Sequence, residues 1–386
     1  MGQVGFKAAT IVVALDNREI VAGTTLSGKI YLNIHKDVSD FTSVHITICG
    51  SELSKITKKG MTRNDASKQK YKAASEFNFL NAAYPLCEID GTMGKGNYEF
   101  PFQCRIPKDV PCSMSCTNSK NDHCEIRYFV DARLHRKGFL KWNVSHQCDF
   151  VVVSAPMMHP PSNTYIGPGS TPITTLSCFK WGSIICGANL SQNIFTPNAI
   201  IAAHHIVLNR STAQIYRIVM TFLEKVHWKA RHRNGRPRES DFVRVLFKHE
   251  VNTSSLSDED RTFATPLSTR PRDGQILDED VMFSNFQNMI QSKIREGGNG
   301  LWSLRVPADI RETCSGRLIT VSHILRLECI TPFGCNNAVV LKAIPVHRLV
   351  LLESTAIYIM CSCVSTGQVP CATADAYEMV KCIGTR

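Results

Sequence analysis

The 386-residue chain lacks several features that define common protein classes. Its most apolar region, residues 339–364, is interrupted by charged residues, whereas a membrane-spanning helix needs about 18 consecutive apolar ones. The N-terminus has no basic segment followed by an apolar stretch, so we expect no secretory leader. The 16 cysteines make up about 4% of the chain, below the roughly 8–10% typical of small disulfide scaffolds. We therefore expect a cytoplasmic protein with reduced thiols.

Motifs for enzymatic chemistry are also missing. The sequence contains no nucleophile elbow, phosphate-binding loop, dinucleotide fingerprint or metalloprotease motif. Cys112, Cys116, His123 and Cys124 have a spacing that fits tetrahedral zinc only loosely. We expect no catalytic residues, no metal and no cofactor. A hydrolase on a β-sandwich scaffold is a remote alternative.

Helical periodicity is scarce, and the dominant pattern has period two. Apolar side chains occupy every second position from 126 to 134, with charged residues between them. A series with the same period begins at Ile319 in the second half of the chain. This alternation is typical of strands with one face on a core and the other in water. It predicts antiparallel sheets in both halves.

The two halves repeat each other weakly across a stretch rich in proline and glycine. Residues 100–107 resemble residues 301–307, and each segment is followed by an alternating strand. We expect an all-β protein of two tandem immunoglobulin-like antiparallel β-sandwiches. The predicted boundaries are residues 1–153 for the first sandwich, 154–175 for the linker, 176–352 for the second sandwich and 353–386 for a tail. A charged insertion is expected in the second sandwich at about 229–298.

The net charge of +11 is concentrated in two short clusters. The first cluster, residues 55–72, has seven basic residues and one acidic residue; the second, residues 225–238, has six basic residues and no acidic one. The rest of the chain carries 31 basic and 32 acidic residues, a net charge of −1. A nucleic-acid binder would be expected to carry a broader basic surface on a recognised fold. We therefore expect no nucleic-acid partner.

The first cluster is a candidate site for cargo or phosphate groups, because a basic loop between strands can meet several phosphate oxygens. A solvated linker explains the same residues equally well. The candidate residues are Lys55, Lys58, Lys59, Arg63, Lys68, Lys70 and Lys72.

The second cluster contains an aromatic residue and is a candidate contact for anionic lipid. An unspecialised exposed loop is the alternative. The candidate residues are Lys225, Trp228, Lys229, Arg231, Arg233, Arg236 and Arg238.

A series of motifs, in the expected order, resembles the arrestin family, meaning arrestins and arrestin domain-containing adaptors. In the first half the similar segments are residues 22–30, 98–102, 106–107 and 126–130. In the second half they are residues 182–195, 209–211, 304–307 and 344–346. The resemblance covers nearly the whole chain.

This resemblance implies two sandwiches joined by a hinge, without catalytic chemistry, acting as a trafficking scaffold. The implied partners are cytoplasmic tails of membrane proteins, in some cases phosphorylated, and coat or ubiquitin-ligase machinery. By position, the first cluster resembles the region through which arrestins contact cargo. The implied location is cytoplasmic, and peripheral at the plasma membrane or endosomes, where an anionic membrane surface is a further candidate partner.

Two family features are not found in the sequence. The Pro-Pro-x-Tyr motif of the adaptor branch is absent, which puts direct recruitment of ubiquitin ligases in doubt. The buried interdomain charge network of receptor-regulating arrestins cannot be placed, because the alternation puts Arg127, Asp131 and Arg133 on a water-facing side. A stable subunit of an endosomal sorting coat, like retromer's arrestin-like subunit, is the alternative to a free adaptor.

Two short motifs near the C-terminus are typical of endocytic proteins. Leu349, Val350, Leu352 and Glu353 fit the leucine-rich, acid-terminated pattern that docks on clathrin, although a buried final strand would look the same. Tyr377 and Val380 fit a tyrosine-based sorting signal, for which a chance match is the alternative.

Overall fold

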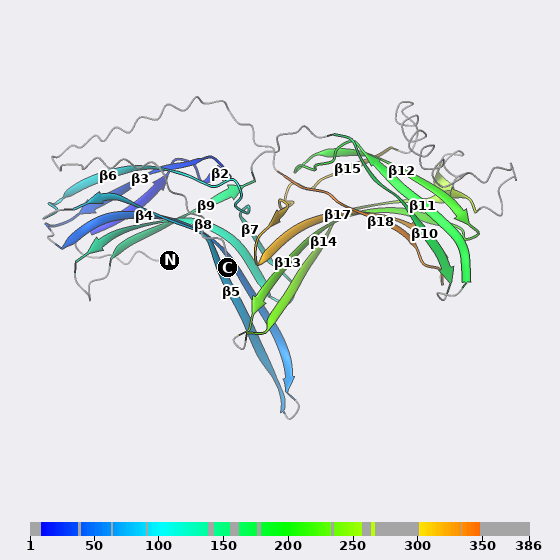
Figure 1. The fold of residues 1–386 in the computed structure, drawn as a ribbon, viewed down its shortest axis with the longest axis horizontal. Coiled ribbons are helices and arrows are strands. Elements are labelled where there is room, and N and C mark those ends of the chain that lie inside the picture. The colour runs from blue at the N-terminus through cyan, green and yellow to red at the C-terminus, as the bar shows by residue number, and fades with distance from the viewer. Residues whose placement is uncertain are drawn as a thin grey trace.

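The computed structural model describes residues 9–37, 40–62, 65–89, 92–137, 143–154, 162–175, 179–232, 235–256, 264–266, 301–332 and 334–347, with the backbone alone described for 58–62, 65–72 and 301. These residues form two β-sandwiches that lie side by side along the long axis of the molecule (Figure 1). The all-β fold predicted from the sequence is confirmed.

The first sandwich is built from the N-terminal half. One sheet has the order β1 (Ala9–Leu15), β3 (Thr25–Ile34), β6 (Gly96–Arg105). The other has the order β2 (Glu19–Val21), β9 (Val144–Val153), β8 (His123–Arg136), β4 (Phe41–Thr62), β5 (Asp65–Glu88), and β7 (Met114–Thr117) pairs with β8. All these pairs are antiparallel except β2 with β9.

The second sandwich follows the same plan. One sheet has the order β10 (Thr164–Thr175), β11 (Phe179–Leu190), β12 (Ile200–Ser211), β15 (Leu301–Arg305). The other has the order β14 (Pro237–Asn252), β13 (Arg217–Arg231), β17 (Ile319–Ile330), β16 (Cys314–Ser315), and β18 (Ala338–Ala343) pairs with β17. A short 3-10 helix, η1 (Thr253–Ser255), follows β14.

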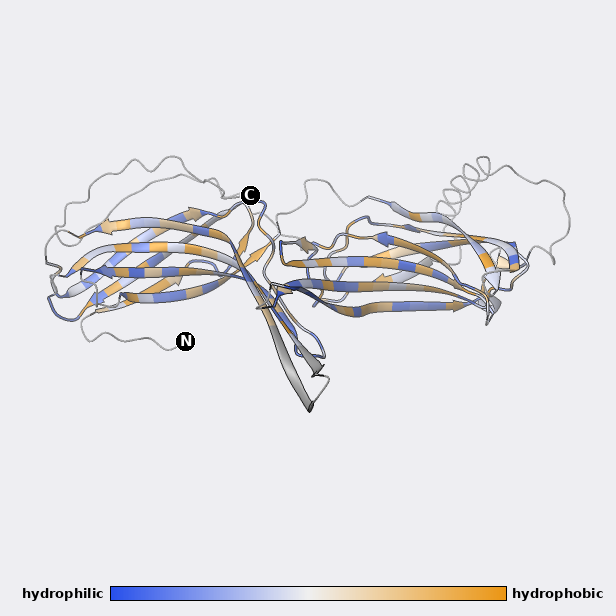
Figure 2. Cartoon of the chain, turned by 60° about the horizontal axis from the view of Figure 1, so that its bottom comes forward, coloured by the Kyte–Doolittle hydropathy of each residue, from blue (hydrophilic) through white to orange (hydrophobic). Residues whose placement is uncertain are grey.

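The strands lie where the period-two pattern of the sequence predicts them. On β8 the alternate residues Ile126, Tyr128, Val130, Ala132 and Leu134 are at most 2% exposed, and most positions between them are more accessible. Hydrophobic and hydrophilic residues alternate along the long strands of both sandwiches (Figure 2). Burial of one face of each strand is the main source of stability in such a sandwich.

Two segments differ from the predicted organisation. Residues 164–175, assigned to the linker, form β10 and pair with β11, because an edge strand tolerates the missing N–H groups of Pro168 and Pro172. Residues 229–231 and 237–252, assigned to a charged insertion, belong to the β13–β14 hairpin. Most of the remaining insertion lies outside the described residues.

The apolar core of the first sandwich continues into the second. Val226, Trp228 and Ala230 of β13, together with Ile319 and Val321 of β17, belong to the same buried cluster as the core of the N-terminal half. The sandwiches therefore meet through a packed interface as well as through their covalent connection. Within the described residues, no helix has the length and apolar character needed to cross a membrane.

Candidate interdomain site

The two basic clusters, more than 150 positions apart in sequence, meet in space. Each occupies the outer part of a long hairpin, β4–β5 in the first sandwich and β13–β14 in the second, and the two project together from the domain junction (Figure 1). Ala73 of β5 forms a bridge with His232, and the N–H of Arg231 donates to Ser75 Oγ at 2.9 Å. We call these two outer segments the paired hairpins.

The first cluster is strand rather than the loop expected from the sequence. Lys55 is exposed on β4, and the register places Lys59 directly opposite Lys70. The backbones of Lys58, Lys68 and Lys72 are also part of the hairpin, whereas Arg63 lies outside the described residues. Like charges directly opposite each other destabilise a strand pair.

The second cluster is partly neutralised by acidic residues that the sequence window did not contain. Lys225 Nζ lies 3.4 Å from Asp241 Oδ1, and Lys229 Nζ lies 3.8 Å from Glu239 Oε1, both across the hairpin on β14. His227 Nδ1 is also 2.8 Å from Asp241. The more basic part of this hairpin is therefore its end, where the exposed residues are Arg231, Arg236 and Arg238. Arg233 lies outside the described residues.

Trp228 does not belong to this surface, so its assignment as a lipid contact is wrong. Its side chain is fully buried and packs in the core that the two sandwiches share. The physical reason is strand parity, because Trp228 is on the same face of β13 as Met220 and Phe222, which are also fully buried.

Glu52 of β4 makes a charged connection across the junction. Its Oε1 accepts a hydrogen bond from the backbone N–H of Arg317 at 2.8 Å, and its Oε2 accepts from the N–H groups of Leu318 at 2.6 Å and Ile319 at 2.9 Å. The side chain is 1% exposed. A Cβ on Gly316 would lie 2.5 Å from Oε1, so the absence of a side chain there leaves room for the carboxylate. Such charge-assisted bonds are about twice as strong as neutral ones.

A second buried carboxylate, Glu224 of β13, lies among the side chains of Arg311, Arg244 and His323. Its Oε2 accepts from the N–H of Arg311 at 3.0 Å, and its Oε1 accepts from Arg311 Nη1 at 2.5 Å. Arg244 Nε is 3.4 Å from Oε1, and His323 Nε2 is 3.6 Å from Oε2. Arg311 Nε donates to the Ser115 carbonyl of β7 at 3.2 Å, which connects the network to the first sandwich.

Burial alone would raise the pKa of Glu224. The neighbouring His323, the N–H of Arg311 and the charges of Arg311 and Arg244 outweigh that effect and lower the pKa to about 2. Glu224 is therefore ionised at neutral pH and pairs with two arginines whose side chains are partly exposed.

Asp122 provides a third polar connection, next to the base of the paired hairpins. Its Oδ1 accepts from the N–H of Thr57 at 2.6 Å, and its Oδ2 accepts from Ser240 Oγ of β14 at 2.7 Å. Asn118 Nδ2 donates to Asp122 at 3.2 Å and to Ser240 at 3.0 Å. The two hairpins are therefore fixed relative to each other where they leave the junction.

This junction was not located from the sequence, although one signal was present. Glu52, Glu224 and His323 each occupy a core-facing position in a mainly apolar period-two series, and each is at most 1% exposed. The sequence pattern had instead placed the charged residues Arg127, Asp131 and Arg133, which lie on β8, on a water-facing side. Arg133 is exposed as predicted, whereas Asp131 is only 9% exposed and accepts from Arg133 Nε at 2.6 Å.

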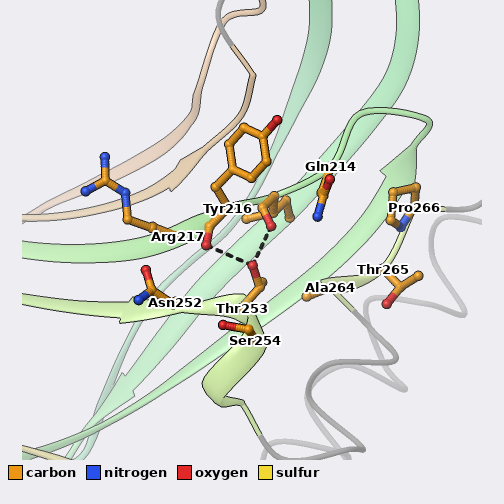
Figure 3. A pocket seen from close by; sticks show the side chains of 10 residues that line it. Gln214, Tyr216, Arg217, Asn252, Thr253, Ser254, Ala264, Thr265 and Pro266 are labelled. Atoms are coloured by element: carbon orange, nitrogen blue, oxygen red, sulfur yellow. Dashed lines mark hydrogen bonds between the residues drawn. The ribbon is translucent and has the colours of Figure 1, made fainter.

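An open pocket of about 900 Å³ lies at the opposite end of β13 from the basic cluster (Figure 3). Thr253 Oγ1 already donates to the carbonyls of Ile215 and Tyr216 there. The lining residues are Gln214, Ile215, Tyr216, Arg217, Asn252, Thr253, Ser254, Ala264, Thr265 and Pro266. Within the described ranges, no group of three His, Cys, Asp or Glu residues could hold a metal ion.

The fold and the junction define a two-sandwich β-protein that presents one basic surface built by both domains. The chain matches the family model of the arrestin (or S-antigen) N-terminal domain over residues 11–157, and that of the C-terminal domain over residues 180–347. The chain therefore belongs to the arrestin family, whose members are generally non-enzymatic adaptors. No curated protein matches it.

The clathrin-type and tyrosine-based motifs, at 349–353 and 377–380, lie outside the described residues.

Proposed function

We propose that this protein is a cytoplasmic adaptor that binds the tails of membrane-protein cargo on the paired hairpins and links them to endocytic or ubiquitin-dependent trafficking. The observation that supports this most is the convergence of the two basic clusters at one packed junction. A surface of this kind attracts anionic segments over distances of about a Debye length. The opposed Lys59 and Lys70 favour a partner that carries phosphate or carboxylate groups.

The link to ubiquitin ligases would have to be indirect, because the chain contains no Pro-Pro-x-Tyr motif. A stable subunit of an endosomal sorting coat is the second candidate. Sedimentation of the endogenous protein separates the two. A free adaptor should sediment mainly near its own mass of 43.0 kDa, whereas a coat subunit should sediment almost entirely in a large complex.

The cargo proposal is tested with a library of membrane-protein tail peptides, each made with and without phosphate. Replacing Lys58, Lys59, Lys68 and Lys70 by glutamine should weaken binding of the phosphorylated forms and flatten the salt dependence. The control replaces Lys225 and Lys229, which already have acidic partners, and should have a smaller effect. Equal affinity for both peptide forms would remove the phosphate-sensing role.

An anionic membrane surface is a further candidate partner, favoured by the exposed Arg231, Arg236 and Arg238. Each basic residue near such a surface is worth about 1 kcal/mol. Reversing these three charges should reduce pelleting with vesicles that contain phosphatidylserine. Failure of the parent protein to pellet would exclude this partner.

A further inference from the structure

We propose that the outer edge of β14 binds an extended peptide, which adds to the sheet as one more strand. β14 is the end strand of its sheet, and in the described part of the chain it pairs with β13 alone. Among the described residues, the N–H and C=O groups on its outer edge have no backbone partner. Strand addition at such an edge is a general mode of peptide recognition, with main-chain bonds supplying affinity and alternate side chains supplying specificity.

Several of the other edge strands in the described structure carry features that discourage pairing. β6 contains Pro101, β10 contains Pro168 and Pro172, and β5 contains Pro85 and pairs with β4 through three register shifts. The short β18 is covered at Lys342, whose Nζ donates to Thr164 Oγ1 and to the Tyr165 carbonyl of β10. β14 has no proline after Pro237, its first residue.

The accessible part of this edge is residues 238–245. A register shift between Phe222 and Leu223 of β13 leaves Leu246 without a partner, which interrupts the regular strand there. Before it, Val243 and Val245 are each 57% exposed and lie two positions apart, so they share one face. Two exposed β-branched side chains beside an open edge would contact alternate residues of an added strand.

The opposite face of β14 holds this edge in place. The Arg311 guanidinium lies 5.5 Å from the centre of the Phe242 ring, and Arg244 contacts both Glu224 and Asp309. Ser240 is tied to Asp122 of the first sandwich. The strand is therefore positioned before a peptide arrives, which lowers the entropic cost of binding.

The chemistry of the occupant follows from the flanking residues. It is an extended peptide with two apolar side chains at positions i and i+2, opposite Val243 and Val245. Acidic residues lie at the end that reaches Arg238 and the neighbouring Arg231, both exposed, beyond Asp241 and Glu239, which already pair with Lys225 and Lys229. The inference rests on the proposed adaptor function for the source of this peptide, a cargo tail, whereas the binding itself can be measured alone.

The experiment measures binding of synthetic nine-residue peptides of this pattern to the full chain by fluorescence anisotropy. The double variant V243K/V245K should weaken binding at least about tenfold, equivalent to about 1.4 kcal/mol. The matched control I200K changes a side chain that is 65% exposed on β12 and should leave affinity unchanged. Thermal unfolding midpoints of all three proteins should agree, because the changed side chains are exposed.

Peptides methylated on backbone nitrogen separate strand addition from side-chain contact. Methylation at one set of alternating residues should abolish binding, and methylation at the other set should preserve it, because only one set of N–H groups faces β14. Equal effects of both sets, or unchanged binding by V243K/V245K, would overturn the proposal. So would a dimer of the parent protein that V243K/V245K dissolves, since a second copy would then occupy the edge.

These outcomes are distinct from failure of the adaptor proposal. If the variants of Lys58, Lys59, Lys68 and Lys70 lose tail binding but still bind the synthetic peptides, both the adaptor proposal and the strand-addition proposal are supported. If V243K/V245K still binds the tails normally, only the proposal that tails add to the β14 edge is ruled out.

Discussion

The domain junction and the paired hairpins are neighbours, yet their charged side chains are arranged in opposite ways. At the junction, Glu52 and Glu224 are buried and every carboxylate oxygen has a close donor. On the hairpins, Lys55 and Arg238 are exposed, and Lys59 faces Lys70 in the strand register. The comparison suggests that the junction serves rigidity and the hairpins serve binding. Changes at the junction should alter stability, and changes on the hairpins should alter binding alone.

The largest effect is expected from Trp228→Ala. The change removes the largest fully buried side chain from the core shared by both sandwiches, and should lower the free energy of unfolding by about 3–5 kcal/mol. Urea denaturation followed by circular dichroism measures it. Trp181→Ala is the matched control, because Trp181 is 43% exposed and its loss should cost about 1 kcal/mol or less. Equal losses would contradict the shared core.

The next effect is expected from Glu52→Ala. Three backbone N–H groups lose their acceptor in a buried site, which should cost about 3 kcal/mol, while Glu52→Gln keeps one acceptor oxygen and should cost less. Amide hydrogen exchange at residues 317–319 should accelerate in step. Glu99→Ala, which removes an exposed partner of Lys29, serves as the control and should change stability little. If exchange at residues 317–319 stays slow in Glu52→Ala, the carboxylate does not hold this segment in place.

A somewhat smaller effect is expected from acid. The folded-state pKa of Glu224 is lowered from 4.5 to about 2, so its ionised form adds stability above pH 4.5, and that contribution is lost as the pH falls toward 2. The loss should reach about 2–3 kcal/mol. Urea midpoints between pH 5 and pH 2.5 measure it. Glu224→Gln should start from lower stability and lose less over this range; a parallel decline in both proteins would disprove the role of Glu224.

The smallest effect is expected from Lys225→Ala and Lys229→Ala. Both side chains are about half exposed, and their partners Asp241 and Glu239 are exposed to a similar degree. Exposed ion pairs of this kind contribute about 0–1 kcal/mol, so unfolding midpoints should stay close to that of the parent. A loss comparable to that of Glu52→Ala would mean that the hairpins, like the junction, maintain the fold.

Much of the fold could be read from local patterns. The alternation on β8 and β17 correctly identified core-facing residues, because a strand places every second side chain on the same face whatever the rest of the chain does. The same parity assigns Trp228 to the core, in series with Met220 and Phe222. The basic residues around Trp228 suggested a membrane contact instead, because a count of charge over a window ignores which face each side chain occupies.

The candidate site was harder to predict from the sequence, because its parts come together through pairing between residues that are far apart in the chain. Asp241 and Glu239 lie outside the window that defined the second cluster, but the hairpin brings them within 3.4 Å of Lys225 and 3.8 Å of Lys229. The connection of Glu52 to residues 317–319 spans the two domains. No local pattern encodes such a contact, although a charged residue in a core-facing position indicates that a buried partner must exist.

The sequence by itself determined the strands, the two sandwiches and the concentration of charge, because alternation and composition depend only on neighbouring residues. The tertiary structure decided that the two basic clusters form one surface, that a shared core and buried carboxylates join the domains, and that β14 is left with an open edge. These outcomes depend on how sheets close and pack, which is set by contacts between residues far apart in the chain.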